Sequence, residues 1–274
     1  MIKLLVPVDF SDTSRNALSY ALDMAQFISL SSVTIFNSFE KVMAGTDGTP
    51  LAANNDVRRN ISLLALENLK NSILNNRNID VKVLAHEGSL VDNMDRLVSE
   101  ENFDMVVMGM NGATRMEQIL IGSSTLNVIA KLSCPVLIVP PAASYNRIRT
   151  VVYASDMKNV EATTPVKTLR KVLAIFSPKL YVANVDTEHF VELTEEYKKE
   201  KEVMNKLLDG FEPDYAFIRL FDFAEAIHQF ASDRKADLII TAPKKHGFLE
   251  KIFTTSHTEK LAYHTHIPLL AIQE

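Results

Sequence analysis

Residues 103–112 read Phe103-Asp104-Met105-Val106-Val107-Met108-Gly109-Met110-Asn111-Gly112, a strand-like run that ends in a glycine turn. Gly122 follows after nine further residues, so three of the eight glycines lie here, directly before a helix-like segment. Glycine lets the backbone approach a bulky anion closely and adopt a positive φ. A helix N-terminus offers unpaired N–H groups and a favourable dipole end to phosphate. The stretch therefore predicts a phosphate-binding turn at the end of a strand.

The rest of the first half alternates short β-branched runs with longer segments that carry apolar residues at helical spacing. This alternation is typical of βαβ units with a parallel sheet. The expected strands are Lys3–Val8, Ser32–Ser38, Asp80–His86, Asp104–Met108 and Pro135–Val139, and the expected helices are Thr13–Ser29, Asp56–Asn75, Leu90–Glu101 and Ser123–Leu132.

The same order repeats in the second half of the chain, where we expect strands at Thr150–Ala154, Lys179–Val185, Tyr215–Leu220, Asp237–Thr241 and Pro268–Ile272. The stretches Val6–Asp9 and Tyr153–Asp156 match, as do Cys134–Val139 and Ile267–Ile272. A repeat of this length indicates duplicated domains rather than a solenoid. The joint falls in the Pro/Ala/Ser-rich stretch 140–146, which has no periodicity. We expect two tandem Rossmann-like α/β domains, residues 1–141 and 147–274, each an open five-stranded parallel sheet with helices on both faces.

Asp9 ends the first expected strand and is a candidate second contact to the same ligand. Ligands of open α/β sheets bind outside the carboxyl ends of the strands, where the strand order reverses. That rule places Asp9 and Gly109 on one rim of the sheet. A turn-forming or helix-capping aspartate is an equally good interpretation, and Ser11 or Asp12 is the expected N-cap of the helix that follows.

Two common nucleotide-binding motifs are absent from the sequence. No Gly-x-x-x-x-Gly-Lys-Ser/Thr run exists, which excludes a P-loop, and no Gly-x-Gly-x-x-Gly follows the first strand. The pattern present is Gly-x2-Gly-x9-Gly-Ser, formed by Gly109, Gly112, Gly122 and Ser123.

With this pattern the chain resembles the universal stress protein family, whose ATP-binding members carry Gly-x2-Gly-x9-Gly-Ser/Thr after the fourth strand. The opening Val6–Asp12 and the closing Ser133–Pro140 of the first half share the resemblance, which extends over nearly the whole chain as two tandem domains. It implies an adenine nucleotide alpha hydrolase-like fold and ATP as ligand, with or without Mg²⁺. It also implies that Asp9 meets the adenine end, whereas the ribose and phosphate contacts fall to Gly109, Gly112, Gly122, Ser123, Ser124 and Thr125.

Other interpretations of this stretch stay open. Met108 could pad the adenine or the ribose, and core packing explains it equally well. In a purely structural interpretation the glycines end a strand and Ser123 only caps a helix.

The second half departs from the glycine pattern. Its fourth strand is followed by Pro243-Lys244-Lys245-His246-Gly247. Counting nine residues past Gly247 leads to His257-Thr258, whereas counting back from Pro268 places Thr255 where Gly122 stands in the first half, and in either case the glycine is absent. Pro243 also removes a backbone donor where Gly109 has one. We therefore expect that the second domain does not bind ATP in the same manner.

Composition excludes several classes of protein. The formal net charge of −5 gives no support for a nucleic-acid-binding face, and no run approaches a membrane span. The single cysteine, Cys134, excludes an intrachain disulfide, fits a reducing cytosol, and is expected to be a small buried apolar side chain. A soluble cytoplasmic protein without membrane or nucleic-acid partners is expected.

Two features of the second half are given ordinary interpretations. His257 and His264 could share a helix face, but no carboxylate or cysteine completes a metal site at ligand spacing. Residues 244–246 form a basic turn at the rim, for which a solvated surface is favoured over an anion site.

The leading hypothesis is a stress-response protein whose first domain binds ATP, or a related adenine nucleotide, as a regulatory ligand. No catalytic residue is assigned, because no nucleophile–base pair or paired carboxylates stand at a convincing spacing. The alternatives are a slow ATPase and an interaction module that binds another small molecule or a protein. The duplication predicts an intramolecular pseudo-dimer in which Val136–Val139 faces Leu269–Ile272, and a further homodimer stays open.

Overall fold

The computed structural model describes residues 2–28, 31–40, 55–75, 77–110, 123–186, 194–219, 223–242 and 266–273. Its first half consists of β1 (Ile2–Pro7), α1 (Asp12–Phe27), β2 (Ser31–Phe39), α2 (Asn55–Ile73), β3 (Asp80–Glu87), α3 (Leu90–Glu101), β4 (Met105–Gly109), α4 (Ser123–Lys131) and β5 (Val136–Val139). The second half consists of β6 (Thr150–Ala154), α5 (Val160–Thr163), α6 (Val166–Phe176), β7 (Lys179–Asp186), α7 (Glu195–Leu207), β8 (Asp214–Arg219), α8 (Phe223–Asp233), β9 (Leu238–Thr241) and β10 (Leu269–Ala271).

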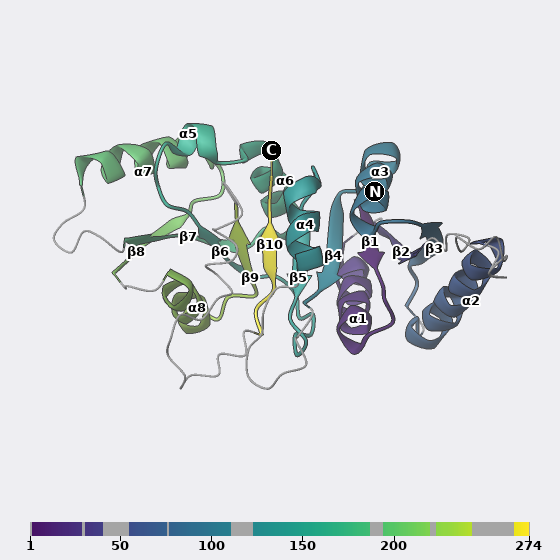
Figure 1. Cartoon of the computed structure of the whole chain (residues 1–274). Coiled ribbons are helices and arrows are strands. Elements are labelled where there is room, and N and C mark those ends of the chain that lie inside the picture. The colour runs from purple at the N-terminus through teal and green to yellow at the C-terminus, as the bar shows by residue number, and fades with distance from the viewer. Residues whose placement is uncertain are drawn as a thin grey trace.

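All strands belong to one ten-stranded sheet in the order β3-β2-β1-β4-β5-β10-β9-β6-β7-β8. Within each half the strands are parallel, and the order reverses beside the first strand, between β1 and β4 and again between β6 and β9. The expected strands are therefore confirmed, and their bounds differ from the prediction by one residue at most. The two five-stranded sheets, one from each half, are joined edge to edge into one mixed sheet (Figure 1).

Side chains alternate between two apolar clusters, one on each face of the sheet. In β4, for example, Met105 and Val107 point to one cluster, whereas Val106 and Met108 point to the other. The first cluster is covered by α1, α2, α6 and α7, and the second by α3, α4 and α8. This arrangement confirms the expected α/β architecture with helices on both faces.

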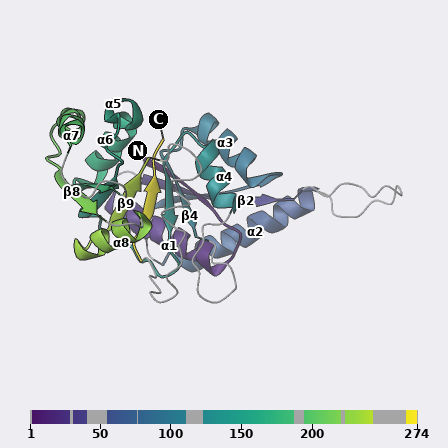
Figure 2. The same ribbon diagram turned by 60° about the vertical axis from the view of Figure 1, so that its left-hand side comes forward.

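The halves meet where β5 and β10 pair in antiparallel fashion, the contact that the duplication predicts for these strands. Leu137 lies opposite Leu270, and the two leucines are 1% and 0% exposed. They also occupy the same position of the repeat, because Leu137 pairs with Val107 and Leu270 pairs with Ile240. A pseudo-twofold axis therefore passes between them. Figures 1 and 2 show β10, the last strand in sequence, in the interior of the sheet beside β9.

The entrance of the fourth strand is fastened to the first strand in the same way in both halves. Asp104 accepts a hydrogen bond from the Lys3 amide (2.9 Å), and Asp237 accepts one from the Thr150 amide (2.9 Å). Asp104 also forms an ion pair with Lys171 on α6, which links the halves at 2.5 Å. Duplicated contacts of this kind show that the repeat seen in sequence is also a repeat of tertiary structure.

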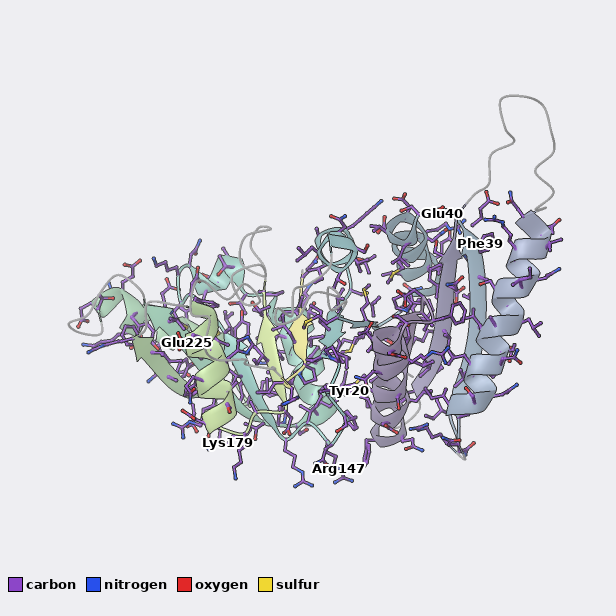
Figure 3. The ribbon with its side chains drawn as sticks, turned by 60° about the horizontal axis from the view of Figure 1, so that its bottom comes forward. Tyr20, Phe39, Glu40, Arg147, Lys179 and Glu225 are labelled. Carbon is purple, nitrogen blue, oxygen red and sulfur yellow. The ribbon has the colours of Figure 1, made fainter. Side chains whose placement is uncertain are left out.

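The connection between the halves is packed rather than loose, although its sequence has no periodicity. The Asn16 side chain on α1 donates to the carbonyls of Pro140 (3.0 Å) and Ala143 (3.1 Å). Tyr145 stacks edge-to-face on Tyr20, with ring centroids 5.2 Å apart. Figure 3 shows Tyr20 on α1 near the middle of the molecule, where the two halves meet. The first helix therefore holds the connecting segment in place.

Cys134 is buried at 6% exposure among the side chains under α3 and α4, as predicted. Burial raises the pKa of its thiol to about 12, so the reactive thiolate is scarce at neutral and mildly alkaline pH. We expect the native protein to resist a thiol-specific chromogenic reagent at about pH 8, and the unfolded chain to react at once with one thiol. Fast reaction of the native protein would contradict the buried position. Since the chain has one cysteine, the reaction also reports global unfolding.

Candidate functional site

The strand order reverses between β1 and β4. In open α/β sheets, ligands bind outside the carboxyl ends of the strands at such a reversal. The turn after β1 contains Asp9, and β4 ends at Gly109. Two segments that the sequence predicts as ligand contacts are thus brought to one rim. Gly112 and Gly122 lie outside the described residues.

Asp9 is exposed and forms a tight turn with Ser11. Its Oδ1 accepts hydrogen bonds from the Ser11 amide (3.0 Å) and the Ser11 hydroxyl (2.5 Å). Phe10 between them adopts a left-handed backbone with φ 66°. Ser11 in turn caps α1, because its Oγ accepts the Ser14 amide at 3.3 Å. The expected N-cap Ser11 is confirmed, and Asp9 shapes the turn that precedes it.

The charge of Asp9 is retained at neutral pH. Burial alone would raise the pKa of its carboxyl group, but hydrogen bonds from Ser11 and Ser14 outweigh burial, and the pKa is lowered from its ordinary value. The site therefore presents an exposed carboxylate at the rim. A carboxylate of this kind can accept hydrogen bonds from an amine or a hydroxyl group of a ligand.

Gly109 lies directly against the first turn of α1. A Cβ at this position would stand 2.4 Å from the carbonyl oxygen of Thr13 and 3.1 Å from the Ser14 nitrogen. Among the described glycines only Gly88 and Gly210 have a positive φ. Gly109 is therefore required by the close packing of α1 on β4, and not by a left-handed backbone. This reason is additional to any contact with a ligand, and it was not predicted.

Other predicted contacts differ in how accessible they are. Met108 is 6% exposed and packs in the cluster under α3 and α4, so its side chain belongs to the core. In the first turn of α4, Ser124 is exposed, whereas Thr125 is 1% exposed. The helix itself begins at Ser123, as expected. Its N-terminal amides and the Ser124 hydroxyl are the groups of α4 best placed to meet an anion.

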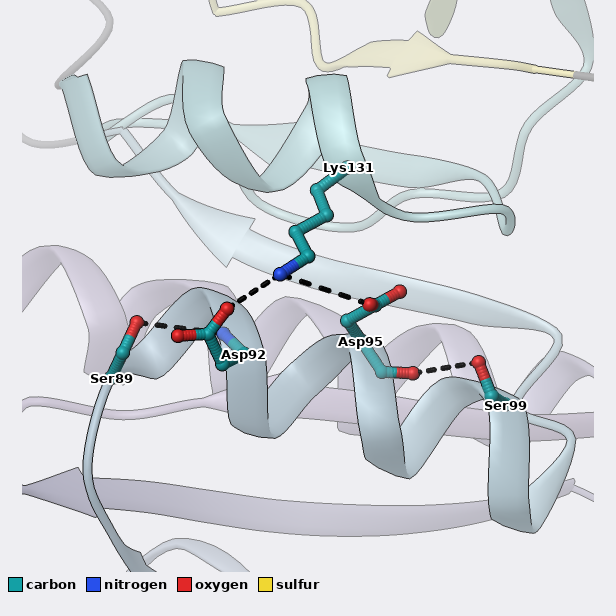
Figure 4. Close-up of polar contacts among 5 residues, drawn as sticks. All are labelled: Ser89, Asp92, Asp95, Ser99 and Lys131. Carbon is teal, nitrogen blue, oxygen red and sulfur yellow. Dashed lines mark hydrogen bonds and ion pairs between the residues drawn. The ribbon is translucent and has the colours of Figure 1, made fainter.

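Helix α4 is held against α3 by apolar packing and by an ion pair (Figure 4). Lys131 bonds to Asp92 at 2.5 Å and lies 3.9 Å from Asp95. The hydrogen bond to Lys131 lowers the pKa of Asp92, but these side chains are exposed and such pairs contribute little to stability. Buried residues of both helices therefore dominate the contact: Met94, Leu97 and Val98 from α3, and Val128, Ile129 and Leu132 from α4 and its end.

The second half repeats the aspartate turn but not the glycine. The Lys158 amide donates to Asp156 Oδ1 at 3.2 Å, and the intervening Met157 has φ 50°, as in the turn of the first half. The strand register places Thr241 opposite Ala271, which makes Ala242 the equivalent of Gly109. The following proline, outside the described residues, then corresponds to Met110 rather than to Gly109. Met110 donates its amide to Val139 (3.1 Å), so proline there removes a sheet donor.

Asn37, a side chain that the sequence analysis did not single out, bonds to the strand end that precedes Asp9. Asn37, at the end of β2, donates to the carbonyl of Val8, and Asn184 donates to Ser155 in the equivalent place of the second half. The signal was available, because both asparagines stand at the same position of the repeat. The role of these asparagines could be understood only once the structure showed which backbone carbonyl lies beside each of them.

Two other features of the described residues bear on function. They contain no cluster of three or more His, Cys, Asp or Glu side chains that could hold a metal ion. No helix in this part of the chain has the length and apolar character needed to cross a membrane. The histidines His257 and His264 and the basic turn 244–246 lie outside the described residues.

Fold and site together define a tandem Rossmann-like α/β protein in which the strand order reverses once in each half, with a glycine, Gly109, at the end of β4 in the first half and Ala242 at the equivalent position in the second. The sequence model of the universal stress protein family matches residues 1–140 and 172–273. The chain belongs to the universal stress protein family. The second match begins at residue 172, within α6, so β6 and α5 lie outside it.

Similar proteins agree with this assignment. Universal stress protein MJ0577 of Methanocaldococcus jannaschii is 29% identical over 153 residues, which are 50% of this chain and 93% of that protein. Universal stress protein MJ0531 of the same organism is 27% identical over 141 residues, which are 50% of this chain and 81% of that protein. A solved universal stress protein from Archaeoglobus fulgidus matches 99% of this chain and 98% of its own, with a TM-score of 0.71 and 18% identity. The last likeness shows the fold of the whole chain.

Proposed function

We propose that the first domain, residues 1–141, binds ATP or a related adenine nucleotide in the crevice between β1 and β4. Asp9 meets the adenine end, and Met108 lies beneath the bound nucleoside. The backbone at Gly109 and Gly112 approaches the ribose and phosphates. The phosphates rest on the start of α4, at Gly122, Ser123, Ser124 and Thr125.

The observation that carries this proposal is the meeting of the Asp9 turn and Gly109 at the switch point of the sheet. The Asp9 turn leads into α1, whose first turn lies so close to Gly109 that a Cβ there would stand 2.4 Å from the Thr13 carbonyl oxygen. In sequence, the glycine pattern connects β4 to α4. Backbone amides and hydroxyl groups can neutralise a phosphate there without a lysine. Membership in a family whose ATP-binding members carry this glycine pattern supports the same ligand.

We further propose that the nucleotide is a regulatory ligand in stress response and not a substrate. The sequence offers no nucleophile–base pair and no paired carboxylates at a spacing that would activate and position water. Mg²⁺ would enter with the phosphates, since it commonly keeps one or two carboxylate ligands and otherwise binds phosphate and water.

The second domain, residues 147–274, acts as the structural partner of the first. It keeps the aspartate turn but has Ala242 and a proline where the first domain has Gly109 and Met110. Pairing of β5 with β10 makes the chain an intramolecular pseudo-dimer. A measurement of the molecular mass in solution tells whether two such chains form a homodimer.

The proposal predicts that purified protein carries an adenine nucleotide. Denaturing the protein and weighing the released small molecules identifies it. Gly122→Val is expected to abolish the bound nucleotide, because a branched side chain would occupy the place of the phosphate. Thr255→Val is the matched control at the corresponding position of the second domain, and it is expected to leave the nucleotide bound.

Three results would contradict the proposal or alter it. A wild-type protein that neither carries nucleotide nor gains thermal stability with saturating ATP would refute it and favour the interaction module, since a ligand selective for the folded state must stabilise it. Loss of nucleotide in Thr255→Val would move the site to the second domain. Turnover of ATP that disappears in Asp9→Ala, with binding retained, would favour the slow ATPase.

A further inference from the structure

We propose that Asn37, oriented by Ser62 of α2, is a positioning residue that fixes the Asp9 turn in its ligand-binding form. The inference rests on the proposed nucleotide site for its functional part. Its structural part, the control of the turn by Asn37, stands on the contacts alone.

The contacts form a short chain from α2 to the rim. The Ser62 hydroxyl donates to Asn37 Oδ1 at 2.6 Å, and Asn37 Nδ2 donates to the Val8 carbonyl at 2.7 Å. Val8 directly precedes Asp9, whose carboxylate is held by Ser11. Three segments that are distant in sequence therefore meet at the residue that begins the turn.

The Val8 carbonyl needs such a partner because the strand ends here. The Val8 amide still bonds to the carbonyl of Phe36 on β2, but the backbone then leaves the sheet through Asp9 and the left-handed Phe10. Val8 is 3% exposed, so a carbonyl without a partner would be costly at this position. The Asn37 side chain replaces the missing main-chain donor and fixes the direction in which the chain departs.

Ser62 decides which way the Asn37 amide faces. An asparagine side chain has one acceptor and one donor end. Because Ser62 is 8% exposed and its hydroxyl donates to Oδ1, the NH₂ group is left to point at Val8. Helix α2 thus helps to hold the turn indirectly, through the bond from Ser62 to Asn37 of β2 and the bond from Asn37 to Val8.

The second half supplies a built-in control. Asn184, 6% exposed, donates to the Ser155 carbonyl at 3.1 Å, and Asp156 follows with the same type of turn. The proposed function gives this half no nucleotide. Loss of either asparagine therefore removes an equivalent structural bond, but only the loss of Asn37 disturbs the proposed nucleotide site.

The test compares Asn37→Ala, Ser62→Ala and Asn184→Ala in the full chain. Two quantities are measured: the dissociation constant for ATP by calorimetry, and the pKa of the Asp9 carboxyl group by NMR titration. Asn37→Ala is expected to weaken ATP binding about tenfold, the effect of one hydrogen bond. It should also raise the pKa of Asp9 toward its ordinary value of 3.8, because the Ser11 hydrogen bonds loosen. Asn184→Ala should change neither quantity.

Ser62→Ala keeps Asn37 and is expected to shift both quantities in the same direction by a smaller amount, about threefold in affinity. If Asn37→Ala does not fold, the two measurements on Ser62→Ala test the proposal in its place. An unchanged Asp9 pKa in both Asn37→Ala and Ser62→Ala would overturn the positioning role. Equal weakening of ATP binding by Asn184→Ala would also overturn it, since the effect would then be global. If wild-type protein binds no ATP while Asn37→Ala still raises the Asp9 pKa, the positioning of the turn stands and the proposed function fails.

Discussion

Leu270→Asp is expected to leave most of the protein unfolded under conditions in which the wild type is folded. Leu270 is fully buried at the centre of the β5–β10 contact, opposite Leu137. Removing the side chain alone costs ~2–5 kcal/mol in a core, and a buried carboxylate without a partner adds to this cost. Since whole domains are stable by only ~5–15 kcal/mol, one substitution at this position removes a large part of the total. Urea denaturation followed by circular dichroism measures the loss.

Leu64→Asp is the matched control, because Leu64 of α2 is 64% exposed. We expect it to cost less than ~1 kcal/mol, mainly through helix propensity. If Leu270→Asp cannot be produced as folded protein, Leu270→Ala replaces it, with an expected loss of ~2–5 kcal/mol in the free energy of unfolding. A Leu270→Asp protein as stable as Leu64→Asp would show that β10 does not lie in the interior of the sheet.

Gly109→Ala is expected to destabilise the protein by ~1–3 kcal/mol and to weaken nucleotide binding at the same time. The new methyl group would stand 2.4 Å from the Thr13 carbonyl oxygen. That atom belongs to the backbone of α1, so the clash is relieved only if the first turn of the helix moves. The Asp9–Ser11 turn, which begins this helix, would move with it. Thermal unfolding and calorimetric titration with ATP measure the two effects.

Ala242→Gly supplies the reciprocal control, because Ala242 is the equivalent residue of the second half. A side chain is already accommodated there, so its removal should leave ATP binding unchanged and alter stability only slightly. Comparison with Gly122→Val separates two reasons for glycine in this motif, which are close packing against α1 and close approach to the phosphates. At Gly109 we expect loss of both stability and binding, since packing requires the glycine. A Gly109→Ala protein of unchanged stability would contradict the close approach to α1.

These two predictions share a structural cause. Helix α1 contributes its first turn to the site, and its Asn16 side chain holds the segment that leads from β5 into the second half. β5 itself is the partner of β10. The same elements therefore build the ligand rim and join the two domains.

Much of this architecture could be predicted from the sequence. Runs of β-branched residues and helical spacing located the strands to within one residue, because both patterns are periodic over a few neighbouring residues. Ser11 as a helix cap and Cys134 as a core residue also followed from their immediate neighbours. The duplication required only that one half be compared with the other.

The role of Gly109 shows what the sequence could not reveal. Its position in a glycine pattern predicted an approach to a ligand, yet the atom closest to its missing side chain is the Thr13 carbonyl oxygen. Asn37 likewise had no visible role until β2 was placed beside the end of β1. For Met108 the sequence left a ligand contact and core packing equally open, and its side chain lies in the core because of the face that α3 and α4 cover.

The sequence by itself determined the elements, their repetition and the family to which the chain belongs, since these depend on local periodicity and on resemblance between stretches of chain. Tertiary structure alone decided the register in which β10 pairs with β5, that α1 lies against Gly109, and that Asn37 bonds to Val8. The physical reason is that such contacts join residues far apart in the chain. Their geometry is fixed only when the whole sheet and the helices on it are packed together.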